Sequence, residues 1–153
     1  MDTVQKEKLE KIKKNNELEF KYHLRNLIKR CETIEELWEI IILFKIEISQ
    51  ESYFYIDQIN RILFIYLSDN SRNMDNEKYL KIIKILEFTA PIGDKDTKDI
   101  LNYIIKKCPK ESSFYPLLMN LYAELEHRLM ILEKKLPSIK IAKPKNIMVE
   151  WYE

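Results

Sequence analysis

Apolar residues recur at helical spacing along most of the chain. One such series in residues 3–31 steps by four, three and four positions, as one face of a helix does: Phe20, Leu24, Leu27 and Cys31. Because this segment contains neither proline nor glycine, the pattern predicts one long helix. The apolar stripe is thinner at the start, so we expect residues 1–15 to project or fray. The adjacent Asn15 and Asn16 mark a candidate break.

Five further segments show the same periodicity, and their predicted helices span residues 34–48, 51–67, 75–89, 94–107 and 113–136. Side chains that cap helix N-termini stand before four of them: Thr33 in a capping box with Glu36, Ser49, Asp94 or Asp96, and Ser112 or Ser113. Prolines at 91, 109 and 137 are expected to end three of these helices, because proline disrupts a helix interior.

These segments predict an all-α fold, a single domain of about six antiparallel helices over residues 1–137. Two arrangements fit the pattern. The helices form an irregular bundle, or two helical-hairpin repeat units pack side by side between flanking helices. A shift of 42 residues supports the second arrangement, since it superposes Asp57 on Asp99 and Asn60 on Asn102. A third copy does not keep this register, so both arrangements stay open.

The last residues, 138–153, differ in character from the rest. They lack helical periodicity, and they end in a strand-forming, aromatic composition that we expect to form an extended C-terminal arm. An apolar arm is expected to be covered by its own domain or by another subunit that it enters, and the remaining alternative is disorder. Its candidate partner-binding residues are Ile147, Val149, Trp151 and Tyr152.

Composition removes several classes of enzyme. The chain has a single glycine, Gly93, so the glycine-rich loops that cradle phosphates and dinucleotides are absent from its sequence. Two isolated cysteines, Cys31 and Cys108, have no metal-ligand spacing, and no leader-like segment is present. We therefore expect an intracellular, most simply cytoplasmic, protein without a membrane span. We also expect no cofactor.

Two patterns in the sequence are candidates for reactive sites. Glu124 and His127 have the Glu-x-x-His spacing of di-iron bundles, but such a site needs a second pair that the sequence lacks. Cys31 or Cys108 is a nucleophile only beside a histidine and an acid, and a cysteine on an apolar stripe is usually a small core residue. Neither pattern predicts catalysis.

Charge is uneven although the formal net charge is only +1. Residues 1–31 carry nine basic and five acidic side chains, whereas residues 32–70 carry two basic and eight acidic ones. Either the two regions attract each other within the fold, or the basic edge meets a partner. Its candidate phosphate-contacting residues are Lys11, Lys13, Lys14, Lys21, Arg25, Lys29 and Arg30.

Three consecutive aromatic residues, Tyr53, Phe54 and Tyr55, point in different directions on a helix, so at least one must leave the core. Together with the aromatic arm, they predict a noncatalytic helical protein-protein interaction module, a scaffold, adaptor or subunit of a larger homo- or hetero-oligomeric assembly. The alternative is a nucleic-acid-associated subunit, from a ribonucleoprotein or a DNA complex, that uses the basic N-terminal helix.

Overall fold

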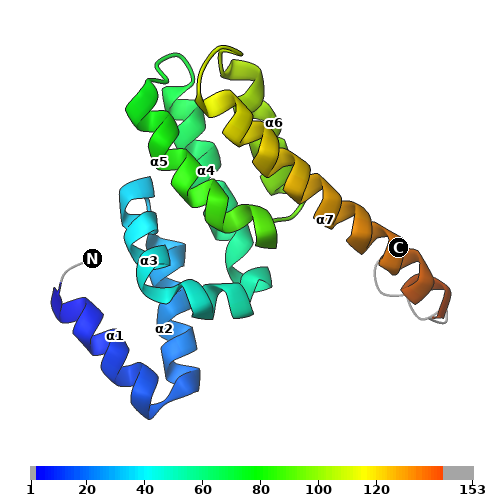
Figure 1. The fold of residues 1–153 in the computed structure, drawn as a ribbon. Coiled ribbons are helices and arrows are strands. Elements are labelled where there is room, and N and C mark those ends of the chain that lie inside the picture. The colour runs from blue at the N-terminus through cyan, green and yellow to red at the C-terminus, as the bar shows by residue number, and fades with distance from the viewer. Residues whose placement is uncertain (1–2, 143–153) are drawn as a thin grey trace.

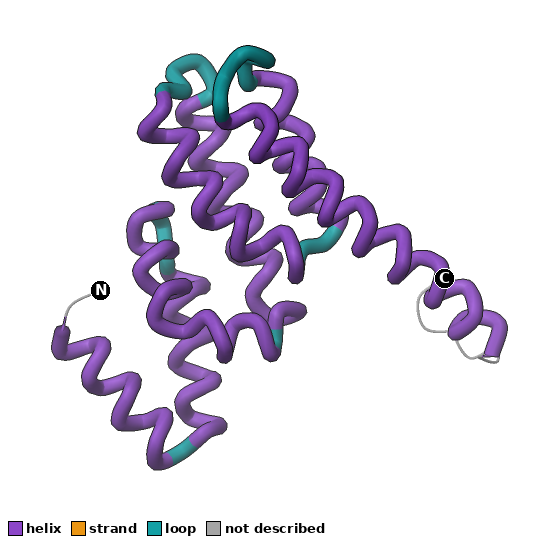
Figure 2. The backbone as a smooth tube through the Cα atoms, in the orientation of Figure 1, coloured by secondary structure: helices purple, strands orange, loops and turns teal. Residues whose placement is uncertain are grey.

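The computed structural model describes the backbone of residues 3–142 and the side chains of residues 3–134 (Figure 1). This part of the chain forms seven α-helices and one short 3-10 helix, η1, joined by short connections (Figure 2). The prediction of an all-α, single-domain fold is confirmed.

The predicted helix 3–31 is in fact two helices, α1 (Thr3–Asn15) and α2 (Glu17–Arg30). Asn16 lies between them with extended backbone angles, and its side chain accepts a hydrogen bond of 3.1 Å from the backbone N–H of Glu19. This N-cap bond satisfies one of the donors that the first turn of a helix leaves unpaired. The prediction of one continuous helix is therefore wrong, and the chain breaks at the candidate asparagine.

The first helix also differs from the projecting or frayed segment predicted for residues 1–15. α1 folds back along α2 and packs against it, and Leu9 is buried in that contact. Lys13 adds an ion pair to Glu47 of α3. The sparse apolar stripe of α1 is thus sufficient for docking because only one side of the helix meets the rest of the protein.

The next two helices are α3 (Ile34–Gln50) and α4 (Ser52–Asn70). The capping prediction for α3 is confirmed, since the Thr33 hydroxyl accepts a 3.2 Å hydrogen bond from the backbone N–H of Glu36. Ser49, predicted as the cap of α4, lies inside α3 instead, and α4 begins without a side-chain cap bond.

The backbone of α3 is kinked at Phe44, whose φ of −129° and ψ of 35° are not helical. The Phe44 ring is buried and packs edge to face on Phe20 of α2, with 5.5 Å between ring centroids. Because of the kink, the two halves of α3 follow different directions.

The chain continues through α5 (Asn76–Thr89), η1 (Ala90–Ile92) and α6 (Lys95–Lys107). Asp94 caps α6 as predicted: its side chain accepts a hydrogen bond from the backbone N–H of Thr97, and the Thr97 hydroxyl accepts one from the backbone N–H of Asp94. This reciprocal pair starts α6 directly after η1.

The single glycine lies between η1 and α6 in a crowded position. A Cβ atom at Gly93 would stand 2.8 Å from Cβ of Thr97 and 2.9 Å from the carbonyl oxygen of Thr89. Its φ of −74° is open to any residue. Glycine is therefore needed here for close approach of two chain segments rather than for a left-handed turn.

The last helix, α7 (Phe114–Ala142), passes through Pro137, so the prediction that this proline ends the helix is wrong. Proline removes one backbone donor, but Glu133, whose carbonyl loses its partner, is exposed and water can replace the bond. Residues 138–142 of the predicted arm are helical, and residues 143–153 lie outside the described part. In Figure 1 the second half of α7 runs away from the other helices.

The helices are arranged in two layers. α2 packs against α4 and α4 against α6 in one layer, while α3 packs against α5 and α5 against α7 in the other. The two predicted repeat units, α3–α4 and α5–α6, thus lie side by side with equivalent helices in contact, as stacked helical hairpins do. One continuous set of buried apolar side chains between the layers forms the core.

Candidate functional site

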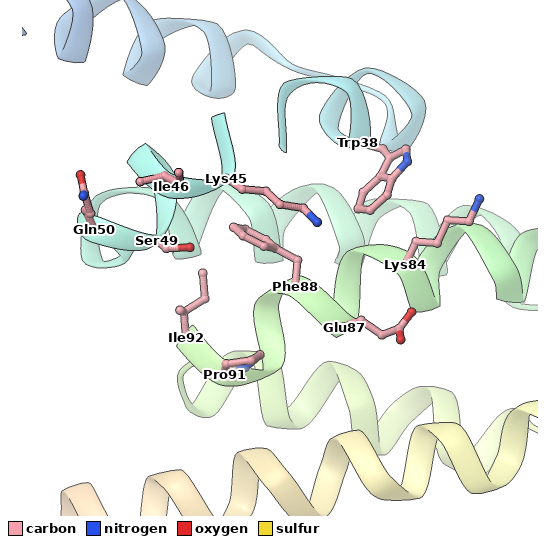
Figure 3. A pocket seen from close by; sticks show the side chains of 10 residues that line it. All are labelled: Trp38, Lys45, Ile46, Ser49, Gln50, Lys84, Glu87, Phe88, Pro91 and Ile92. Atoms are coloured by element: carbon pink, nitrogen blue, oxygen red, sulfur yellow. The ribbon is translucent and has the colours of Figure 1, made fainter. Parts of the chain in front are cut away.

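A groove of about 780 Å³ lies between α3, α5 and η1, and we call it the α3–α5 groove. Its volume falls in the range of ligand pockets. Ten residues line it: Trp38, Lys45, Ile46, Ser49, Gln50, Lys84, Glu87, Phe88, Pro91 and Ile92 (Figure 3).

The centre of this groove is aromatic and its rim is polar. Phe88 points from α5 toward α3, and Trp38 and Lys84 lie together at one end (Figure 3). The Lys45 ammonium nitrogen lies 5.8 Å from the Trp38 ring centroid, within the range of a cation–π contact. Ile46 is 68% exposed, so the groove presents apolar surface to solvent.

One helix, α3, supplies both ends of the groove. Trp38 stands before the kink, and Lys45, Ile46 and Ser49 stand after it. Lys84 and Phe88 are one turn apart on the facing helix, so their side chains lie on the same side of α5. The groove therefore lies between two helices that are about 40 positions apart in the chain.

A second groove, of about 580 Å³, lies between α4 and α6 and is called the α4–α6 groove. It is lined by Asp57, Asn60, Arg61, Phe64, Leu67, Asp96, Asp99, Ile100 and Tyr103. Carboxylate oxygens of three residues at one end, Asp57, Asp94 and Asp96, lie within 4.8 Å of one another. Three acidic side chains thus converge at this end of the groove, which gives it a negative local field.

A hydrogen-bonded network holds the wall of the α4–α6 groove. Asn60, only 5% exposed, donates from its amide nitrogen to the Asp94 carboxylate at 3.0 Å. Its amide oxygen accepts a 3.0 Å hydrogen bond from the buried Thr97 hydroxyl. The side chain of a residue on α4 thus completes the capping box of α6, and the acidic end has a defined geometry.

The three predicted aromatic contact residues separate in the structure. Tyr53 is 70% exposed and Phe54 is 42% exposed, whereas Tyr55 is 1% exposed and belongs to the core. Tyr55 is therefore removed from the candidate contacts, and Tyr53 and Phe54 stay as predictions. The Phe54 ring is already covered on one side by the Arg25 guanidinium, 3.5 Å from its centroid.

The predicted basic edge is divided by the break at Asn16 and partly neutralised inside the fold. Lys13 pairs with Glu47, and Lys21 and Arg25 both lie within 4 Å of Glu51. This supports the interpretation in which the basic and acidic regions attract each other. The remaining candidates of the edge are exposed: Lys11, Lys14, Lys29 and Arg30.

Cys31 is buried, and Glu124 and His127 lie apart from both grooves. The pKa of the Cys31 thiol is raised to about 12. Burial is the largest cause of this rise, and the negative charge of the neighbouring Glu36 is the second. A thiol of this kind stays protonated at neutral pH and is a poor nucleophile. Glu124 and His127 are exposed on α7 and do not belong to the acidic group of the α4–α6 groove.

Four predicted contacts of the arm, Ile147, Val149, Trp151 and Tyr152, lie outside the described residues. Sequence reasoning missed both grooves, because each is formed by helices that are about 40 positions apart in the chain. One signal pointed to the second groove: the 42-residue shift pairs Asp57 with Asp99, and both line it.

Comparisons with models of protein families, with curated proteins and with solved structures found no match to this chain. Among the helices of residues 3–142, none combines the length and the apolar character needed to cross a membrane.

Proposed function

We propose that this chain is a noncatalytic protein-binding module, a subunit or adaptor of a larger assembly, which receives an apolar segment of a partner protein in the α3–α5 groove. The observation that carries this proposal is the pair of aromatic side chains in the groove, Phe88 at its centre and Trp38 at one end, beside the exposed Ile46. Aromatic anchors in a concave site provide much of the binding energy of protein interfaces.

The rim of the groove adds a charge preference. Lys45 and Lys84 border the aromatic centre, with Glu87 as the acidic member of the lining. A partner segment that combines apolar side chains with a carboxylate beside Trp38 and Lys84 fits this rim best, because the lysines then face an opposite charge. An amphipathic helix laid along a groove between helices presents its side chains in this way.

The alternative, a nucleic-acid-associated subunit, receives less support. Its basic edge is split between two helices, and Lys13, Lys21 and Arg25 face acidic partners within the fold. Phosphate binding would have to break those pairs or rely on the remaining exposed cations.

The proposal is tested by a pull-down from the native cell extract. The proteins that the intact chain retains are compared with those that two single variants retain. Ile46→Asp places a charge in the groove, and Ile42→Asp places the same charge one turn earlier on α3, at a residue that is 53% exposed and does not line the groove. Both sites are exposed, so folding should be preserved, as circular dichroism can check.

We expect quantitative mass spectrometry to find a defined set of proteins retained by wild type and by Ile42→Asp but depleted at least about tenfold with Ile46→Asp, because a buried unpaired carboxylate is costly at an interface. Equal recovery with both variants would contradict the groove as the binding site. Failure of the wild type to retain any protein would contradict the function.

A further inference from the structure

The α4–α6 groove has an ordered chemistry along its length, distinct from the α3–α5 groove. α4 and α6 run in the same direction, since Asp57 and Asp96 lie together at one end and Phe64 and Tyr103 line it further along. Beyond the aromatic pair, the Lys107 ammonium lies 5.6 Å from the Tyr103 ring centroid. The order along the groove is therefore acidic, apolar, basic.

The residues that line the α4–α6 groove offer little positive charge to its acidic end. Arg61 is the basic residue among the described lining residues, and its guanidinium donates to the Lys29 carbonyl oxygen and to the Gln58 side chain, each at 3.4 Å. These bonds direct its charge toward α2. The exposed carboxylates of Asp57, Asp96 and Asp99 then face solvent together, which favours a cationic occupant.

The chain itself contains a segment with the reverse order of chemistry. After α7, Lys143 and Lys145 are followed by Ile147, Met148 and Val149, and then by Glu150. The order in this segment is basic, apolar, acidic. An occupant with this order places each part against its complement in the groove.

The spacings of the two patterns also agree. Along α4, the rise from Asp57 to Phe64 is about 10 Å. In an extended chain, the distance from Lys145 to Met148 is also about 10 Å. The lysines can therefore lie at the acidic end while the apolar residues lie between Phe64 and Tyr103.

The lysines of the same chain start far from the acidic end of the groove. Arg128 of α7 donates to the Gly93 carbonyl oxygen at 3.3 Å, next to Asp94 at the acidic end. From Arg128 to Ala142, α7 rises about 21 Å away from that point. The three residues that lead to Lys145 can return at most about 11 Å.

The projecting half of α7 gives a second reason to expect another chain there. Three consecutive large apolar residues, Met130, Ile131 and Leu132, are exposed on it. A neighbouring molecule that receives the C-terminal segment would also cover this part of α7, which removes apolar surface from water.

We propose that the α4–α6 groove binds residues 143–153 of a second copy of this chain, with Lys143 and Lys145 against Asp57, Asp96 and Asp99. Reciprocal exchange of the two segments gives a closed two-fold dimer in which both grooves are filled. This interaction is independent of the partner proposed for the α3–α5 groove.

The test is sedimentation velocity of the full-length chain over a wide concentration range. One variant, Asp57→Lys with Asp99→Lys, reverses the groove, and another, Lys143→Glu with Lys145→Glu, reverses the segment. We expect wild type to form a dimer and each variant to raise the apparent dissociation constant by about tenfold or more, because like charges then face each other. Asp69→Lys with Glu111→Lys reverses two exposed charges elsewhere and should dimerise as wild type does.

The decisive measurement is an equimolar mixture of the two reversed variants. In a mixed dimer, the lysine-bearing groove faces the glutamate-bearing segment, and the native groove faces the native segment, so dimerisation should return. If the mixture stays monomeric while both variants keep wild-type circular dichroism, the proposal is overturned. A monomeric wild type whose melting temperature rises with calcium or magnesium would assign the carboxylates to a metal ion instead.

Discussion

At the scale of single residues, burial decides what Cys31 can do. Its side chain is 1% exposed, and desolvation of the thiolate is the largest cause of its raised pKa. The Sγ atom lies 3.3 Å from the Thr33 carbonyl oxygen, to which the thiol donates. The burial of Cys31 and the nearby Glu36 carboxylate suit a protonated thiol and penalise a thiolate.

Stability should therefore depend on Cys31 at alkaline pH. In the unfolded chain the thiol loses its proton near its ordinary pKa of 9.0, whereas in the folded chain it keeps the proton until about pH 12. The stability that the neutral thiol contributes is complete below pH 9 and is lost as the pH rises toward 12. We expect the free energy of unfolding of Cys31→Ala to fall less steeply with rising pH than that of the wild type does. Urea denaturation at a series of pH values measures it, and parallel profiles would contradict the assigned shift.

At the scale of elements, one side chain decides whether the N-terminal region is one helix or two. Both α1 and α2 consist of strong helix formers, so intrinsic propensity alone favours continuation. The Asn16 cap and the packing of α1 against α2 favour the break. The tertiary contact wins because a long isolated helix would leave Leu9 exposed.

Replacing the cap should weaken this hairpin. We expect Asn16→Ala to lower the free energy of unfolding by about 1 kcal/mol, since the Glu19 N–H loses its acceptor. The matched control is Asn15→Ala, an exposed neighbour at the end of α1 that does not cap α2. Chemical denaturation compares the two variants, and an equal effect at both positions would show that the cap is not what stabilises the break.

At the scale of the whole molecule, the two hairpins α3–α4 and α5–α6 are joined by apolar packing and by one buried polar link. Asn60 on α4 bonds to both Asp94 and Thr97 at the start of α6. A buried amide with two partners fixes the relative position of the two helices, because any sliding would leave polar groups unpaired.

Removing this link should cost more than a surface substitution does. We expect Asn60→Ala to lower the free energy of unfolding by about 1–3 kcal/mol, because the Thr97 hydroxyl and the Asp94 carboxylate lose a partner. Asn120→Ala, at an exposed position on α7, is the control and should change stability little. Hydrogen exchange adds a second measure, since protection of α6 should fall before that of α3. If Asn60→Ala had the same free energy of unfolding as the wild type, the stabilising role of this link would be contradicted.

Local patterns predicted what depends on neighbours a few positions apart. Apolar spacing identified the helical regions, and Thr33 and Asp94 marked two helix starts correctly. The same reasoning failed at Ser49 and Pro137, where α3 and α7 continue past residues that usually interrupt a helix. Packing and solvation outweigh a local preference of a few kcal/mol at such points.

The sequence by itself determined that this chain is a helical domain with a single glycine and no glycine-rich phosphate loop. Only the tertiary structure decided the rest: the kink at Phe44, the burial of Tyr55 beside the exposed Tyr53, and the two grooves. The physical reason is the distance along the chain over which each kind of interaction acts. Helix periodicity and capping act over one or two turns, whereas a groove is formed by side chains that the fold brings together from helices far apart in the chain.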